Sequence, residues 1–215
     1  MAKQGIRFVL VGAIFDALGV AGAAWGVVGH LLSLVVAGAI LAALATVFTA
    51  FCVYFFRDPE RPLPTDSTTL YAPGDGRVLA ISEETPGTTT IRIFLSVFDV
   101  HIQRAPCSGS VRSVVYQPGS FRAAMVEAAK GNERSIMTIS PEGRPDVVVE
   151  QIAGLVARRI ETWPKQGERV TMGQRYGIIY FGSQAAVHLP KGAVPVVKPG
   201  DRVAGALTPI ARWTS

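Results

Sequence analysis

Residues 178–190 read Ile-Ile-Tyr-Phe-Gly-Ser-Gln-Ala-Ala-Val-His-Leu-Pro. Two β-rich runs, 178–181 and 185–189, flank the dipeptide Gly182-Ser183. Glycine tolerates backbone conformations that other residues rarely adopt, and it lets another group approach its carbonyl closely. Serine places a hydroxyl one residue beyond that carbonyl. The stretch by itself fits either a Gly-Ser bulge between two strands or a reactive peptide bond.

Short β-type runs dominate the chain beyond residue 70. They cover residues 77–81, 88–95, 110–116, 136–140, 147–152 and 155–160, with Gly and Pro clusters between them at spacings typical of antiparallel sheet. One helix is predicted over 121–130, because Ser120 can cap it, apolar residues recur at helical spacing, and Gly131 ends it. We therefore predict a mainly β (α+β) fold, with a β-rich, barrel-like domain over 70–215 that contains about one helix.

Two Pro-Gly-Asp turns, at 73–75 and 199–201, each lead into a strand that contains valine. This repeated turn has two interpretations. It indicates a quasi-duplicated β unit like those of lipoyl-type barrels, or it reflects only that Pro-Gly-Asp is a common turn.

The first 56 residues contain two apolar runs, 6–25 and 31–56, joined by the neutral link 26–30. The second run is uncharged and longer than the ~20 residues that span a bilayer. Asp16 weakens the first run, since a carboxylate at the bilayer centre costs roughly 2.5–3.5 kcal/mol. We expect this segment either to lie shallowly in the membrane or to pair Asp16 with another group.

Basic residues flank the apolar region on both sides. Lys3 and Arg7 precede it, and Arg57 and Arg61 follow it. The positive-inside rule then places both ends in the cytoplasm and predicts a membrane-associated helical hairpin over 1–56. A signal peptide cleaved after residue 23 is the alternative, but it leaves the second apolar run unexplained.

Composition limits which binding partners we expect for the domain over 70–215. Proline-punctuated residues 57–69 indicate a linker to it. Cys52 and Cys107 are the two cysteines, and their placement favours neither a disulfide nor a metal site. The net charge of +5 favours an anionic partner, and behind an apolar hairpin anionic lipid fits better than nucleic acid.

The segment FGSQAAVHLP around Gly182-Ser183 resembles the self-cleavage site of the short-form phosphatidylserine decarboxylase proenzymes, a pyruvoyl-dependent family. Five further segments resemble the same family in order and cover nearly all of the chain after the apolar region: FFRDPERP (55–62), APGDGRV (72–78), FLSVFDVH (94–101), GNER (131–134) and IAGLVARRI (152–160).

The resemblance implies two reactions at Ser183. The Ser183 hydroxyl attacks the Gly182 carbonyl, and elimination from the resulting ester followed by hydrolysis leaves an N-terminal pyruvoyl group. Fragments 1–182 and 183–215 then form a heterodimer, with a higher oligomer possible in principle. The pyruvoyl ketone forms a Schiff base with the amine of phosphatidylserine, and loss of carbon dioxide yields phosphatidylethanolamine. No metal is expected.

The base is sought among three histidines. His30 lies between the apolar runs, which excludes it, and His188 stands where the family usually has tyrosine, which favours a structural role. His101 matches the Asp-x-His motif of the family. The resemblance also identifies Asp75 as the carboxylate that orients His101, with Asp99 as the alternative.

This chain departs from the family pattern at several positions. Arg104 stands where longer-form relatives have a second histidine, so either His101 serves both reactions or Arg104 takes part. The other departures are Gln184, Ala186 and Ser135, which put local substrate contacts in question but not the cleavage.

These observations predict a self-processing, membrane-bound phosphatidylserine decarboxylase, a lyase of phospholipid biosynthesis. The same chemistry on another serine-headgroup lipid, and an inactive membrane-tethered β-barrel binding module, are the alternatives. A serine hydrolase fits less well, because the GxSxG nucleophile elbow is missing. Since Asp75, His101 and Ser183 all follow the linker, a chain that starts near Leu63 is expected to self-cleave.

Overall fold

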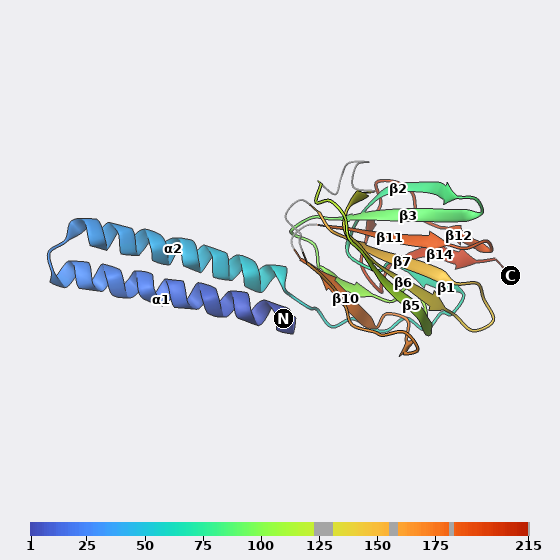
Figure 1. Ribbon diagram of the computed structural model, residues 1–215, viewed down its shortest axis with the longest axis horizontal. Helices are drawn as coiled ribbons and strands as arrows, with labels where there is room; N and C mark the ends of the chain where they lie inside the picture. Colours follow the sequence, from blue (N-terminus) through green and yellow to red (C-terminus); the bar gives the residue numbers. More distant parts are fainter. Residues whose placement is uncertain (123–130, 155–158, 181–182, 215) are drawn as a thin grey trace. The chain divides into compact units, whose positions relative to one another are not determined.

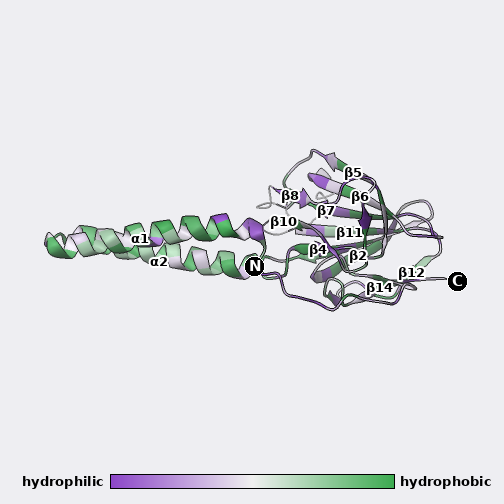
Figure 2. Cartoon of the chain, turned by 90° about the horizontal axis from the view of Figure 1, so that it is seen from below, coloured by the Kyte–Doolittle hydropathy of each residue, from purple (hydrophilic) through white to green (hydrophobic). Residues whose placement is uncertain are grey.

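A computed structural model describes residues 1–122, 131–154, 159–180 and 183–214, and it divides the protein into two compact units, Met1–Pro59 and Glu60–Ser215 (Figure 1). The first unit is the predicted helical hairpin. A 3-10 turn, Lys3–Gly5, leads into α1 (Ile6–Val28), and α2 (Leu32–Phe55) follows. Both helices are long and apolar enough to cross a membrane, and apolar residues run along both of them in Figure 2.

Small residues allow the two helices of the hairpin to pack closely. Gly12, Gly19 and Gly26 are buried at a seven-residue spacing along α1. A Cβ atom on Gly19 would lie 2.5 Å from the Ala42 backbone nitrogen, and one on Gly26 would lie 2.7 Å from that of Val35. Such small-residue contacts are a common means of helix association in membranes. Because Gly26 packs against α2, α1 continues to Val28, and the link is shorter than the predicted 26–30.

Asp16, the carboxylate within the first apolar run, has a hydrogen-bond partner on α2. The Thr46 hydroxyl on α2 donates a hydrogen bond of 2.7 Å to Asp16 Oδ1 on α1. Of the two arrangements expected for Asp16, the structure contains the paired one. A hydrogen bond between helices lowers the cost of placing this polar group in an apolar segment.

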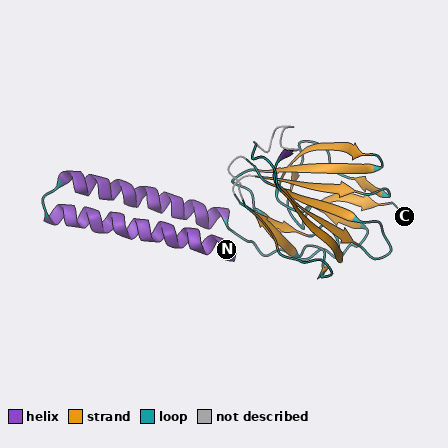
Figure 3. Cartoon of the chain, in the orientation of Figure 1, coloured by secondary structure: helices purple, strands orange, loops and turns teal. Residues whose placement is uncertain are grey.

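The second unit is built from three antiparallel sheets, shown as orange strands in Figure 3. The eight-stranded sheet has the order β13 (Arg202–Val203), β2 (Gly76–Thr85), β3 (Thr88–Leu95), β11 (Ser183–Leu189), β7 (Val147–Ile152), β6 (Arg134–Ser140), β5 (Gly109–Gln117) and β9 (Arg169–Val170). One three-stranded sheet has the order β4 (Ile102–Arg104), β10 (Arg175–Ile179), β8 (Ile160–Thr162). The other has the order β1 (Thr69–Tyr71), β14 (Pro209–Trp213), β12 (Ala193–Pro195).

The central strands of the large sheet bury side chains on both faces, but with different chemistry. Alternate residues of β3, β11 and β7 enter the hydrophobic core, including Ile93, Val187 and Val149. Several of the residues between them are polar and still buried, among them Arg92, Gln184 and Glu150. This two-residue period is that of a strand, and it separates an apolar core from a polar layer on the other face.

The mainly β fold predicted from the sequence is confirmed. The runs 88–95 and 147–152 match β3 and β7, whereas several two- and three-residue strands carry too few residues to show a pattern. The helix predicted over 121–130 falls mostly on residues 123–130, outside the described part of the chain, as do 155–158 of the run 155–160. The strands that follow the two Pro-Gly-Asp turns pair with each other: β13 lies antiparallel to β2, with Arg202 opposite Arg77.

The segment expected to be a linker makes specific contacts with the β unit. Arg175 donates to Glu60 at 2.7 Å. Gly173 has a φ of +78°, and a Cβ there would meet Pro64 Cδ at 2.6 Å, so Pro64 lies directly against its backbone. The first residues after Pro59 therefore belong structurally to the second unit.

Candidate active site

Residues 96–101, the His101 crossing, connect β3 of the large sheet to β4 of the β4–β10–β8 sheet. Strand β11 pairs with β3, and strand β10 pairs with β4. Ser183 lies opposite Leu95 at one end of this crossing, and the Ile179 amide donates to the His101 carbonyl at 3.3 Å at the other. The topology therefore brings the two segments singled out by the sequence to one place.

Ser183 is the first residue of β11 and is fully buried. Its Oγ has no hydrogen-bond partner among the described residues. A buried hydroxyl is normally paired, because leaving it unpaired costs roughly 1–3 kcal/mol. Gly182, the predicted partner in cleavage, lies outside the described residues. Ser183 thus has the burial and the unused hydroxyl of a reacting group rather than of a structural serine.

His101 immediately precedes β4 and is buried. Its Nδ1 lies 3.0 Å from the backbone carbonyl oxygen of Asp99. A carbonyl can only accept, so Nδ1 carries a proton, and in the neutral form of the ring Nε2 is the nitrogen with the lone pair. This tautomer is the one that a general base acting through Nε2 requires.

The His101 crossing is stiffened by Asp99, which sequence reasoning had considered as the orienting carboxylate. Asp99 Oδ2 accepts from the amide and the hydroxyl of Ser96 at 2.9 and 2.8 Å. Its Oδ1 lies 3.0 Å from Arg202 Nη1. The carboxylate therefore closes its own turn, and Asp99 orients His101 through its backbone carbonyl instead.

Asp75 lies in the turn before β2, and its carboxylate hydrogen bonds go to Arg61 and to the Gly205 amide. This turn also contacts β4: the Arg104 amide donates to the Pro73 carbonyl at 2.7 Å. A Cβ on Gly74 would lie 2.9 Å from Gln103 Nε2. The turn that contains Asp75 therefore lies beside β4, the strand that follows His101. His101 Nδ1 itself contacts the Asp99 carbonyl.

Arg104, which stands where longer relatives have a second histidine, is buried in β4. Its Nη1 donates to the Gly173 carbonyl at 3.1 Å. The guanidinium therefore links β4 to the loop before β10. Gln103, its neighbour, donates through Nε2 to the His101 carbonyl at 3.3 Å.

His188 lies on β11 but on the opposite face from Ser183, because strand residues alternate and the two are five positions apart. Its Nδ1 lies 2.9 Å from Thr90 Oγ1, and its Nε2 lies 3.1 Å from Glu150 Oε1. Burial raises the pKa of the Glu150 carboxyl, but His188, Arg134 and Arg92 outweigh it and hold that pKa below its usual value. His188 has the contacts of a structural residue.

Sequence reasoning noted the GNER segment but missed what Asn132 does. This buried side chain makes four hydrogen bonds: Oδ1 accepts from Ser120 Oγ and the Arg122 amide, and Nδ2 donates to the Arg122 and Ala153 carbonyls, at 2.7–3.0 Å. These use its whole capacity. Ala153 follows Ile152, the residue paired with Gln184 next to Ser183, so Asn132 fixes the backbone beside the site. The only local signal of this role in the sequence was the asparagine that follows Gly131.

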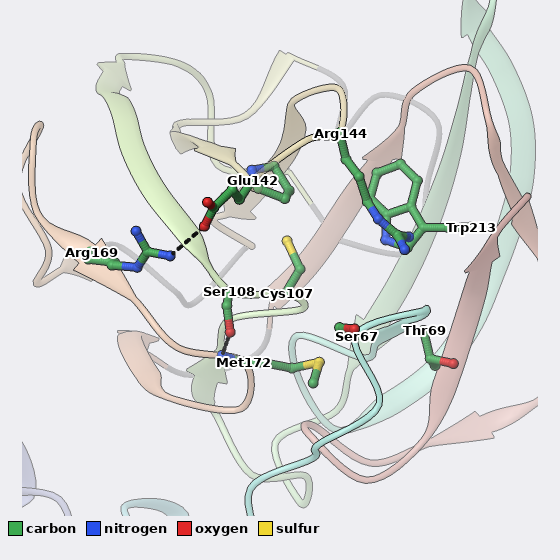
Figure 4. Close-up of a pocket in the computed structure, with 10 residues that line it drawn as sticks. Ser67, Thr69, Cys107, Ser108, Glu142, Arg144, Arg169, Met172 and Trp213 are labelled. Carbon is green, nitrogen blue, oxygen red and sulfur yellow. Dashed lines mark hydrogen bonds and ion pairs between the residues drawn. The ribbon is translucent and has the colours of Figure 1, made fainter. Parts of the chain in front are cut away.

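A cavity of about 340 Å³ lies at the other end of the large sheet, where β6 ends and β5 begins (Figure 4). Trp213 and Arg144, whose guanidinium lies 4.9 Å from the indole centroid, form one wall. Burial raises the pKa of the Cys107 thiol in this cavity to about 12, which makes it a poor nucleophile. None of the ten lining residues is a histidine. The cavity therefore lacks the combination of serine and histidine that Ser183 and His101 provide.

The fold defines a class of protein: a unit of antiparallel sheet, with Ser183 and His101 buried in it, that follows an apolar helical hairpin. Comparison with known proteins makes this class specific. The chain belongs to the phosphatidylserine decarboxylase family, whose family model matches residues 48–211.

Relatives resemble the chain over most of its length. A phosphatidylserine decarboxylase proenzyme from Symbiobacterium thermophilum is 44% identical over 203 residues, which cover 87% of this chain and 93% of the relative. A second, from Granulibacter bethesdensis, is 43% identical over 182 residues, 80% of this chain and 74% of the relative. A third, from Paraburkholderia phymatum, is 40% identical over 98% of this chain and 96% of the relative. The family resemblance predicted from the sequence is confirmed.

Proposed function

We propose that this chain is a proenzyme that cleaves itself between Gly182 and Ser183 and then decarboxylates phosphatidylserine to phosphatidylethanolamine. The observation that carries the proposal is the buried Ser183 hydroxyl, which has no partner among the described residues. It lies at the start of β11, opposite Leu95, the residue from which the chain leads to His101. The relatives named as phosphatidylserine decarboxylase proenzymes support both the precursor state and the substrate.

In self-cleavage, His101 is proposed to accept the Ser183 hydroxyl proton at Nε2 while Oγ attacks the Gly182 carbonyl carbon. The C–N bond then breaks and an ester replaces the amide. Removal of the Ser183 α-proton expels the Gly182 carboxylate, and water converts the remaining dehydroalanine to a ketone with release of ammonia. His101 suits the first step because its Nδ1 proton is engaged by the Asp99 carbonyl.

The residues around Ser183 suit the pyruvoyl group expected after cleavage. When formed, that group supplies a ketone that takes up the substrate amine and withdraws electrons from the carbon that bears the carboxylate. The β11 strand would hold it in place, since residue 183 pairs with Leu95 and residue 184 with Ile152.

The two fragments are proposed to remain together as a heterodimer. Fragment 183–215 contains β11, which lies between β3 and β7 of the large sheet, and also β13, which pairs with β2, and β14, which pairs with β1. A break before residue 183 leaves all of these backbone pairings intact. Their hydrogen bonds and the core beneath β11 then stabilise the association without a covalent link.

The apolar hairpin is proposed to place the enzyme at a membrane, with both ends in the cytoplasm. Lys3 precedes α1, Arg7 lies in its first turn, and Arg57 follows α2, which is the distribution that the positive-inside rule associates with this orientation. A membrane is also where a phospholipid substrate lies.

The proposal is tested by expressing the full chain and comparing it with Ser183→Ala on a denaturing gel and by intact mass spectrometry. We expect two fragments from the first chain, the smaller spanning 183–215 with a blocked N-terminus, and one uncut chain from the variant. Decarboxylation of phosphatidylserine vesicles should follow cleavage. An uncut chain with full activity would contradict the proposal.

A further inference from the structure

The two Pro-Gly-Asp turns of this chain use their aspartates differently. Asp201 Oδ2 accepts from the Lys198 amide at 2.9 Å, which is the local bond of an ordinary turn. The Asp75 carboxylate accepts instead from Arg61 and Gly205, residues far away in sequence. Tertiary contacts, not turn closure, therefore fix the orientation of Asp75.

Arg61 binds this carboxylate with both terminal nitrogens. Nη1 lies 2.7 Å from Oδ1, and Nη2 lies 2.8 Å from Oδ2. Nη1 also donates to the Gly205 carbonyl at 2.6 Å, and the Gly205 amide returns a bond of 2.8 Å to Oδ1. Bidentate pairing fixes the plane of the carboxylate as well as its position. The Arg61 and Asp75 side chains are only 9% and 19% exposed, so solvent screens the pair weakly.

The arrangement leaves acceptor capacity on one oxygen. A carboxylate offers about two acceptor positions on each oxygen. Among the described residues, Oδ1 takes two hydrogen bonds and Oδ2 takes one. Asp75 can therefore accept one more hydrogen bond through Oδ2, in a direction that Arg61 sets.

The backbone around Gly205 is shaped for this contact. A Cβ on Gly205 would lie 3.2 Å from Gly74 Cα and 3.3 Å from Arg61 Nη1, so a larger residue would crowd both. Ala206, which follows, has a φ of +62°, and its amide donates to the Ala72 carbonyl at 2.9 Å. Non-glycine residues adopt this conformation at a cost and are found preferentially where function requires it.

We propose that Arg61 is a positioning residue for self-cleavage: it holds the Asp75 carboxylate so that its remaining acceptor position serves a donor at the catalytic centre. This inference rests on the proposed role of Asp75. Arg61 and Asp75 belong to fragment 1–182 and Gly205 to fragment 183–215, so after cleavage the same contacts join the two fragments. The proposed role of Arg61 also changes the expectation for a chain that starts near Leu63. Because that chain lacks Arg61, we now expect it to self-cleave more slowly than the full chain.

The experiment measures the rate of self-cleavage of the full chain after cell-free synthesis in lipid nanodiscs. The variants are Arg61→Gln, Arg61→Lys, Asp75→Asn and the double variant Arg61→Gln/Asp75→Asn. Glu60→Gln and Asp201→Asn are matched controls: the first removes a neighbouring ion pair of the same segment, and the second alters the aspartate of the other turn. Unfolding temperatures of all variants are measured in the Ser183→Ala background, where none can cleave.

We expect Asp75→Asn to slow cleavage at least about 100-fold, as for loss of an acid–base group. Arg61→Gln should slow it about 10- to 100-fold, which is the cost of a misplaced group. Arg61→Lys should recover part of this loss, because it keeps the charge but not the fork. The double variant should cleave no more slowly than Asp75→Asn, since both changes affect one unit. Both controls should stay within about twofold, a change too small for a group that takes part in catalysis.

Each outcome separates the inference from the proposed function. Normal cleavage of Asp75→Asn would remove the proposed role of Asp75, and the inference with it. Slow cleavage of Asp75→Asn with normal or faster cleavage of Arg61→Gln would overturn the inference alone. If Arg61→Gln lowers the unfolding temperature strongly, the comparison moves to Arg61→Lys. Equal cleavage by Arg61→Lys and the parent chain would then contradict the need for a bidentate contact.

Discussion

His101 and His188 differ in the atoms that surround them. His101 is buried, its Nδ1 faces a backbone carbonyl, and it ends the segment that follows Leu95, the residue opposite Ser183. His188 contacts a hydroxyl through one nitrogen and the Glu150 carboxylate through the other, on the far face of the sheet. These partner atoms support the proposed role of His101 as the base and a structural role for His188.

A similar contrast holds for Ser183, the proposed nucleophile. Ser183 begins β11 on the face of the strand that continues into the core, with an unpaired hydroxyl among the described residues. Gln184, one position later, points to the polar face, where Arg92 Nη1 donates to its Oε1 at 2.9 Å. A one-residue shift in register would exchange the two environments.

The largest effect is expected at Ser183. Ser183→Ala removes the attacking oxygen, so cleavage should stop completely and no pyruvoyl group should form. The check is a denaturing gel together with decarboxylation of phosphatidylserine vesicles. Ala186→Ser, which puts a hydroxyl on the opposite face of the same strand, should not restore cleavage in this background. Any fragment of the expected mass in Ser183→Ala would disprove the assignment.

The two histidines should respond very differently to the same substitution. His101→Gln should slow self-cleavage by about 10²- to 10⁴-fold, because a general base is lost. His188→Gln lies on the far face and should change the rate by less than about threefold, since it leaves the base in place. Fragment ratios against time measure both. Similar rates for the two variants would mean that the contrast between their surroundings does not determine their roles.

A smaller effect, on stability, is expected for the Glu150 carboxylate. Its pKa in the folded protein is lowered, so its ionisation stabilises the fold above the pKa of the unfolded chain, about 4.3. This stabilisation is lost as the pH falls through the folded-state pKa. Glu150→Gln should cost roughly 3 kcal/mol near neutral pH, as for one partner of a buried ion pair. The deficit should shrink below about pH 4.

The measurement is denaturant unfolding of the parent and Glu150→Gln chains at several pH values, both in the Ser183→Ala background so that neither is cleaved. A deficit that stays constant from neutral to acidic pH would show that the charge of Glu150 does not contribute. His188→Gln should reproduce part of the same pH dependence, because His188 is the leading group that lowers this pKa.

The smallest effect is expected at Thr90. Thr90→Val removes the hydroxyl 2.9 Å from His188 Nδ1 but keeps the shape of the side chain. The loss should be about 1 kcal/mol in unfolding free energy, the usual contribution of one hydrogen bond. Self-cleavage should not change. A clear loss of cleavage in Thr90→Val would connect the polar face to the catalytic centre and weaken the contrast drawn between the two histidines.

The sequence by itself determined those features that depend on local pattern. Hydropathy predicted the two apolar helices, and two-residue alternation predicted the long strands such as β3 and β7. Gly182-Ser183 and His101 were singled out by their motifs. Local patterns suffice here because burial of an amphipathic or apolar segment depends mainly on its own side chains.

Only the tertiary structure decided which distant groups meet. It pairs Asp16 with Thr46, gives Asn132 its four hydrogen bonds, and places His188 on the face away from Ser183. It also holds Asp75 with Arg61 and Gly205, where the motif indicated only a catalytic carboxylate. A polar side chain can bond with any group that folding brings within about 3 Å, and neither its identity nor its motif specifies which one. Sheet register and chain crossings make that choice.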